Sequence, residues 1–216
     1  MIIAAHQPNF LPNLAFFNKM KTADLFVIIT NLQFEKQEGW QQRHKIKGPN
    51  GDIWLTVPVL GSQNQKIKDV KINNQVNWRK KHQKTIRMVY AKSKGEDLID
   101  EINSIYGSEP ERLVEVNYRA ILKLKDILGI ETKVVLDDKV SGNKHELIIN
   151  ICKKYKADTY LSGVGALDYM TKERLAELKK NNIKHKFVEK NLTSLYPYST
   201  LHYLLSEGRE WILNVI

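Results

Sequence analysis

The chain has 216 residues, a net charge of +10 and one cysteine, Cys152. This length is enough for one large α/β domain or two small ones, and a single cysteine excludes a disulfide framework and a cysteine-based zinc site. No apolar run approaches the roughly 20 residues that span a bilayer. Because the start of the chain also lacks the features of a secretory signal, we expect a cytoplasmic protein.

The positive charge is concentrated in one segment of the chain. Between residues 36 and 94, fourteen Lys and Arg stand against three acidic residues, and the remainder is close to neutral. Such a segment indicates an anionic partner: a nucleotide, a nucleotide-sugar or an RNA such as tRNA. A solvated lysine-rich surface is an equal alternative, because lysine predominates and arginine is the better phosphate ligand.

The first thirty residues have the pattern of a strand, a helix and a second strand. A short apolar run ends at His6, and Pro8 prevents its continuation as a strand. Residues 14–20 have helical apolar spacing, with Asn9 or Asn13 as the cap, and residues 25–30 form a continuous apolar strand. Ligands of open α/β sheets bind where strands end. We therefore consider a catalytic role for His6, beside the more common structural one.

The middle of the chain changes character. Gly48-Pro49-Asn50-Gly51 predicts the turn of a hairpin, a short edge strand is expected over residues 66–72, and residues 77–90 have helical spacing. Trp78 and His82 share one face of that helix and Lys81 lies beside them. We expect this face to look into a ligand cleft, since a buried histidine beside lysines would suffer charge repulsion. A core position is the alternative.

The second half alternates strands and helices. Helices are expected over residues 96–106, 108–128, 145–155, 172–181 and 200–213, and strands over 132–136, 159–161 and 186–188. The alternation predicts an α/β fold, a Rossmann-like three-layer sandwich, with one domain over residues 1–216 and a small β-rich basic insertion at about 36–75. Lys19 and Asp24 lie at the far end of the first crossover, where a structural ion pair or cap is the simpler interpretation.

The loop after the strand at 159–161 carries Ser162, Gly163 and Gly165, and such glycines allow backbone N–H groups to approach an anion, although a plain turn is equally compatible. The sequence contains no metal-ligand spacing, no Walker phosphate loop and no Gly-x-Ser-x-Gly elbow, so we predict neither a metal nor a bound cofactor.

Several segments together resemble the WbqC-like family. They are His6-Gln7-Pro8-Asn9-Phe10-Leu11-Pro12, Trp40-Gln41-Gln42-Arg43, Trp54-Leu55-Thr56-Val57-Pro58-Val59, Trp78 with Lys81-His82, and Tyr160-Leu161-Ser162-Gly163. The resemblance implies cytoplasmic work on nucleotide-activated sugars in surface-polysaccharide (O-antigen type) biosynthesis. One departure is His202, which stands where the family usually has an acidic residue.

The favoured function is a transferase that modifies a nucleotide-activated amino sugar, by acyl or aminoacyl transfer. The opening is also distantly similar to nucleotidyltransferases and pantothenate-synthetase-like ligases, so nucleotidyl transfer or ATP-dependent ligation is one alternative, and a non-catalytic nucleotide or RNA binder is another. We predict His6 and His82 as catalytic bases and Arg43 as a diphosphate ligand. The other predicted substrate-binding residues are Gln7, Asn9, Asn31, Gln33, Trp78, Lys81, Ser162 and Gly163.

Overall fold

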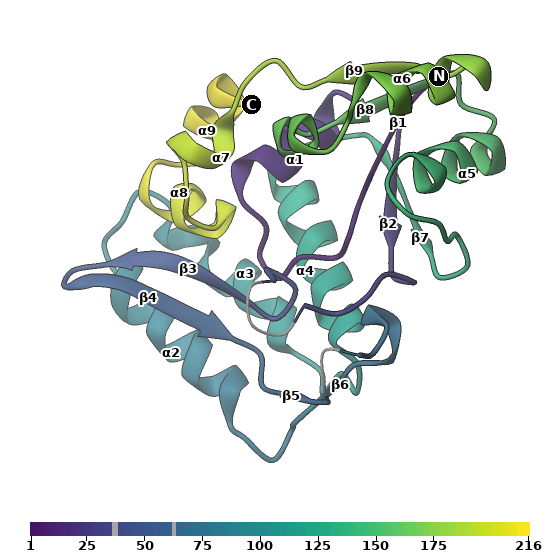
Figure 1. Cartoon of the computed structure of the whole chain (residues 1–216). Coiled ribbons are helices and arrows are strands. Elements are labelled where there is room, and N and C mark those ends of the chain that lie inside the picture. The colour runs from purple at the N-terminus through teal and green to yellow at the C-terminus, as the bar shows by residue number, and fades with distance from the viewer. Residues whose placement is uncertain (36–38, 62–63) are drawn as a thin grey trace.

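The computed structural model of the chain describes residues 1–35, 39–61 and 64–216. Its centre is a parallel sheet with the strand order β7-β2-β1-β8-β9 (Figure 1). The strands are β1 (Ile2–His6), β2 (Leu25–Ile29), β7 (Lys133–Asp137), β8 (Thr159–Ser162) and β9 (Lys184–Phe187). This is the doubly wound arrangement, in which the strand order reverses between β1 and β8 and ligands bind in the crevice at that point.

Helices cover both faces of the sheet, which confirms the predicted three-layer, Rossmann-like architecture (Figure 1). One face packs against α1 (Leu14–Lys21), α4 (Leu113–Leu128) and the C-terminal helices α7 (Leu192–Leu195), α8 (Thr200–Ser206) and α9 (Arg209–Val215). The opposite face packs against α5 (His145–Tyr155) and α6 (Lys172–Lys180). Every residue of β2 is buried because the strand has a neighbour on each side and helices above and below.

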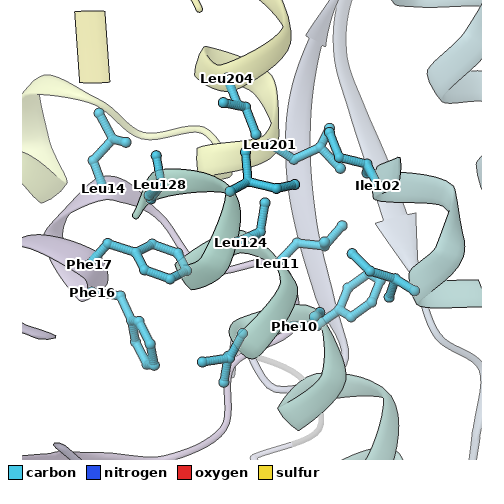
Figure 2. Packing of buried hydrophobic residues seen from close by; sticks show 14 of the residues in the cluster. Phe10, Leu11, Leu14, Phe16, Phe17, Ile102, Leu124, Leu128, Leu201 and Leu204 are labelled. Carbon is cyan, nitrogen blue, oxygen red and sulfur yellow. The ribbon is translucent and has the colours of Figure 1, made fainter. Parts of the chain in front are cut away.

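The larger core lies on the α1 side, where aromatic and aliphatic side chains converge. Figure 2 shows Phe17 of α1 near Leu124 of α4 and Leu201 of α8, and Phe16 belongs to the same cluster. The Asn13 side chain accepts a hydrogen bond from the backbone N–H of Phe16 at 3.2 Å and so caps α1. This packing and the cap hold α1 close to the carboxyl end of β1.

The segment after β2 forms a hairpin of β3 (Arg43–Gly48) and β4 (Gly51–Thr56), as predicted. β5 (Val59–Leu60) pairs with β6 (Lys71–Ile72), followed by α2 (Trp78–Tyr90) and α3 (Ile99–Asn103). The buried side chains Ile46, Leu55 and Val57 belong to the same cluster as those of α4. The division into one domain with an insertion stays a prediction, which this continuous packing supports.

Four predicted elements differ clearly from those observed. The helix expected over residues 108–128 begins only at Leu113, because Arg112 before it is extended. The strand expected over 66–72 is partly a 3₁₀ turn (Ile67–Asp69), and the helix expected over 96–106 is α3 flanked by 3₁₀ turns (Glu96–Leu98 and Ser104–Tyr106). The last helix divides into α8 and α9 at Gly208, whose φ of 89° is not helical. Among the described residues, no helix combines the length and apolarity that a membrane crossing requires.

Candidate functional site

A cavity of about 520 Å³ lies at the carboxyl ends of β1 and β8, where the strand order reverses. Ala5 and His6 reach it from β1, and Tyr160 and Ser162 reach it from β8. The structure places five of the predicted site residues on its wall: His6, Gln7, Asn9, Ser162 and Gly163. The topology thus brings together residues that are more than 150 positions apart in the sequence.

His6 is a neutral imidazole, and one of its two ring nitrogens is already hydrogen-bonded within the protein. Its Nδ1 lies 2.9 Å from the carbonyl oxygen of Gln7, and because a carbonyl only accepts, the hydrogen is on Nδ1 and Nε2 carries the lone pair. Burial, and secondarily the nearby Lys19 ammonium, lowers the pKa of His6 to about 3 despite the Gln7 hydrogen bond. Phe16 packs edge-on against the ring at 5.0 Å and fixes its orientation.

Lys19 belongs to the site, although the sequence analysis placed this residue at the far end of the first crossover. Its side chain is buried, lines the cavity, and donates from Nζ to the carbonyl oxygen of Ala5 at 2.9 Å. Burial lowers the pKa of Lys19 to about 7. No Asp or Glu is among the described residues that line the cavity. The cation therefore lacks an acidic partner there, and an anionic ligand would supply one. Asp24, in contrast, has the expected structural role, since it accepts from the backbone N–H of Ile2 at 2.6 Å.

The loop after β8 forms another wall of the cavity. Gly163 and Gly165 line it, and at neither position would a Cβ come within 4 Å of a described residue other than its chain neighbours. Packing does not require glycine here, and the bare backbone leaves room for a ligand. Ser162 Oγ lies 2.9 Å from Nε2 of His185, a contact that the sequence analysis did not anticipate. Burial lowers the pKa of His185, whose Nδ1 has no hydrogen-bond partner among the described residues.

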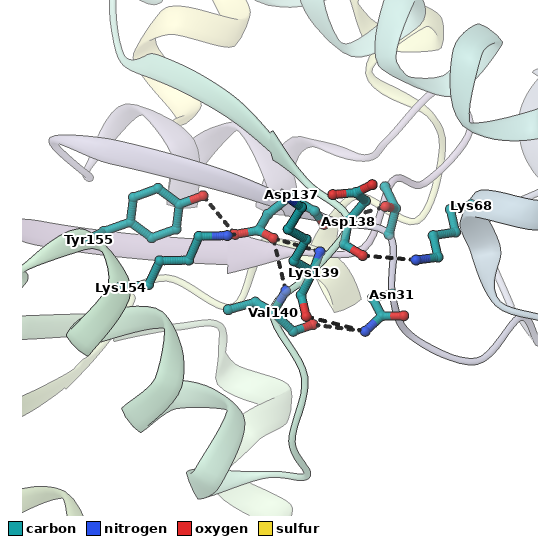
Figure 3. A network of polar contacts seen from close by, with 9 residues as sticks. Asn31, Lys68, Asp137, Asp138, Lys139, Val140, Lys154 and Tyr155 are labelled. Carbon is teal, nitrogen blue, oxygen red and sulfur yellow. Dashed lines mark hydrogen bonds and ion pairs between the residues drawn. The ribbon is translucent and has the colours of Figure 1, made fainter.

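Asn31 and Gln33 are not brought to the cavity. Asn31 donates to the carbonyl oxygens of Lys139 and Val140, in the polar network after β7 (Figure 3). Gln33 forms a β-bridge with Lys66. Both residues do follow a strand at the correct edge of the sheet. They follow β2, however, which lies one strand away from the point where the order reverses.

Arg43 and Lys81 also lie outside the cavity wall. The guanidinium carbon of Arg43 is 4.7 Å from the centre of the Trp54 ring, so this side chain packs along the hairpin. Lys81 is exposed on α2. A diphosphate in the cavity would therefore meet Lys19 rather than Arg43.

The expectation that Trp78 and His82 look into the cleft is wrong. Trp78 and His82 are only 2% and 5% exposed, and their rings pack edge-on against each other at 5.4 Å and against Tyr106. Burial lowers the pKa of His82 to about 4, so the imidazole is neutral and neighbouring lysines do not repel it. A neutral His82 ring carries no charge, so charge repulsion does not keep it out of the core.

His202 does not line the cavity. Its Nδ1 lies 2.8 Å from the Tyr90 hydroxyl, and the rings of Tyr198 and Tyr203 pack beside it. Burial lowers the pKa of His202 to about 4. As for metals, the described residues include no group of three or more His, Cys, Asp or Glu side chains placed to hold an ion.

The fold and the cavity define a doubly wound α/β protein with its candidate site in the crevice beside the first strand. The chain belongs to the WbqC-like protein family, whose sequence profile matches residues 7–204. It is also similar to a Mycobacterium tuberculosis protein described as "uncharacterized protein Rv1507c", with 30% identity over 182 residues that cover 82% of this chain and 78% of that protein. No solved structure matches the chain significantly.

Proposed function

We propose that the protein is a cytoplasmic transferase of surface-polysaccharide biosynthesis that modifies a nucleotide-activated amino sugar by acyl transfer. The observation that carries the proposal is the composition of the cavity wall. The described residues that line it include no Asp or Glu, and they include the buried Lys19 and the neutral His6. Such a site suits a substrate that carries phosphate and also has a proton to lose. The cavity volume is within the range of about 300–1,000 Å³ typical of small-molecule sites.

The proposed step assigns one task to each side chain. Lys19 holds a phosphate oxygen of the substrate. The sugar nitrogen attacks the carbonyl carbon of an activated acyl donor, a C–N bond forms, and the bond to the leaving group breaks. A substrate phosphate on Lys19 would oppose the ammonium charge and so raise the pKa of His6. Nε2 of His6 then takes the proton that the nitrogen loses and passes it to the departing group. The Ser162 hydroxyl donates to the oxygen of the tetrahedral intermediate, where negative charge develops.

Binding is tested first, by calorimetric titration with a UDP-linked amino sugar, with ATP and with tRNA. We expect the UDP-sugar to bind and Lys19→Met to abolish that binding. Lys80→Met, which removes an exposed lysine of α2, is the matched control and should bind normally. Absence of nucleotide-sugar binding to the wild-type protein would refute the proposal, and binding of ATP alone would favour nucleotidyl transfer or ligation.

Catalysis is tested by incubating the UDP-linked amino sugar with acetyl-CoA as the probe donor and weighing the product by mass spectrometry. A gain of one acetyl group that disappears with His6→Gln supports the assignment of the base. For the tRNA titration, an RNA-binding protein would show a slope of log affinity against log salt of about −0.7 per phosphate neutralised on a single strand. Ion pairs of Arg79 with Glu109 and Arg87 with Asp100 already engage part of the basic segment, which disfavours that alternative.

A further inference from the structure

Two tryptophans lie stacked on the surface, and one of them, Trp40, lines the cavity. The rings of Trp40 and Trp54 are 5.9 Å apart between centres and inclined by only 21°. They remain 39% and 46% exposed, although tryptophan carries one of the largest apolar surfaces that a folded chain can bury. Contiguous apolar surface that stays exposed on a folded protein is typical of binding sites.

The tryptophan pair (Trp40 and Trp54) is held in place by the protein itself. The backbone N–H of Phe10, in the loop after β1, donates to the carbonyl oxygen of Trp40 at 2.9 Å. The buried His44 ring lies 4.6 Å from the Trp40 ring, and burial lowers the pKa of His44 to about 4, so this contact is between two neutral rings. With Arg43 over the Trp54 ring, the pair is ordered before any ligand arrives.

Trp40 also lines the same cavity as His6 and Lys19. The site therefore has a flat aromatic surface at one part of its wall and a buried cation at another. A ligand that matches both has a planar ring joined to an anionic group, which is the chemistry of a nucleotide. Trp40 keeps 39% of its surface exposed although its ring contacts Trp54 and His44, and this exposed aromatic surface is what a base would stack on.

We propose that Trp40 stacks on the nucleobase of the bound nucleotide while Lys19 receives its phosphate. This inference rests on the proposed function, and it names the residue that recognises the base. Trp40 thus takes over the substrate-binding role that the sequence analysis gave to Trp78, which the structure places in the core.

The test compares UMP with ribose 5-phosphate, which carries a phosphate on the same sugar but no base. The wild-type protein should bind UMP about 10-fold more tightly or better, which is the affinity that one base stack contributes. Trp40→Ala should bind UMP no better than ribose 5-phosphate, whereas Trp40→Phe should keep most of the preference. Lys19→Met should weaken the binding of both ligands.

A fluorescence titration keeps the test valid if Trp40→Ala folds poorly. UMP should quench the tryptophan emission of the wild-type protein, and the quenching should be mostly absent in the well-folded Trp40→Phe variant. If Trp40→Ala folds and binds UMP as tightly as the wild type, the stacking role is wrong and the proposed function stands. If the wild type binds neither UMP nor ribose 5-phosphate nor a UDP-sugar, both proposals fail. If Trp40→Ala changes only the oligomeric state, the pair is an interface between copies and the inference is overturned.

Discussion

At the scale of single residues, burial of the Lys19 ammonium lowers the stability of the fold. The folded state lowers its pKa from 10.5 to about 7, so between these pH values the unfolded chain binds a proton that the folded chain does not. Lys19→Met should raise the free energy of unfolding at pH 7 by about 1–3 kcal/mol, because it removes a buried charge without a carboxylate partner. Urea denaturation measures this gain, which should shrink as the pH rises toward 10.5.

The gain should coincide with a loss of ligand binding, since the same ammonium destabilises the fold and attracts the anion. Lys80→Met should change the free energy of unfolding by less than about 0.5 kcal/mol, as surface substitutions usually do. A Lys19→Met protein that is less stable than the wild type at pH 7 would show that the Ala5 hydrogen bond outweighs the burial of the charge.

The second residue prediction concerns the proton affinity of His6. Burial is the main reason that its pKa is about 3, and the charge of Lys19 adds to it. A bound phosphate would oppose the Lys19 charge and favour the imidazolium, so the pKa of His6 should rise when UMP binds. Titration of the His6 ring by NMR, with and without UMP, measures the shift. A pKa that stays near 3 in the complex would place the phosphate away from this pair.

At the scale of elements, α2 is an anchor of the core rather than part of the site. Trp78 is almost completely buried among Tyr106 and His82, and its Nε1 donates to Asn74 at 3.4 Å. Trp78→Ala should therefore lower the free energy of unfolding by about 3–5 kcal/mol, as aromatic core truncations do. In Trp78→Phe, a milder change, ligand affinity should equal that of the wild type. A selective loss of affinity with normal stability would restore the cleft interpretation.

The sequence predicted the helices and strands better than it predicted what surrounds each side chain. The physical reasons differ between residues. The prediction that His6 and Ser162 lie at the carboxyl edge of the sheet agrees with their place on the cavity wall, because strand direction alone determines where those residues lie. Helical spacing showed that Trp78 and His82 share a face, but periodicity does not tell which structure covers that face. Lys19 was misplaced because position was judged along the chain, whereas its long side chain reaches back to Ala5.

The sequence pattern also did not predict the order of the strands in the sheet. Asn31 and Ser162 both follow buried strands, and only the pairing of β1 with β8 decides that Ser162 lines the crevice and Asn31 does not. Trp40 was part of the resemblance but received no role, because it lies in irregular chain between elements and no periodicity marks it.

At the scale of the whole molecule, buried histidines make the fold sensitive to acid. His44 and His82 are 3% and 5% exposed, and burial lowers the pKa of each from 6.5 to about 4. Between pH 6.5 and 4 the unfolded chain takes up protons that the folded chain excludes, so stability falls as the pH falls. Each of these histidines should contribute a loss of about 2–3 kcal/mol by pH 4.

Denaturation curves recorded at steps between pH 7 and 4 measure this loss. His82→Gln should make the dependence shallower by about one proton per molecule near pH 5, since one buried titrating group is gone. An unchanged pH dependence in that variant would mean that His82 is protonated within the fold.

The position of the cavity has a consequence for local stability. In the described structure, the sheet consists of β7, β2 and β1 on one side and β8 and β9 on the other, and the pairing of Ile3 with Tyr160 lies at the join between them. A ligand in the crevice contacts both sides at once, so it opposes their separation and stabilises the closed sheet by mass action. Amide hydrogen exchange in β9 should therefore slow in proportion to the occupancy of the site. Because no residue of β9 lines the cavity, backbone protection there would report binding from outside the cavity wall.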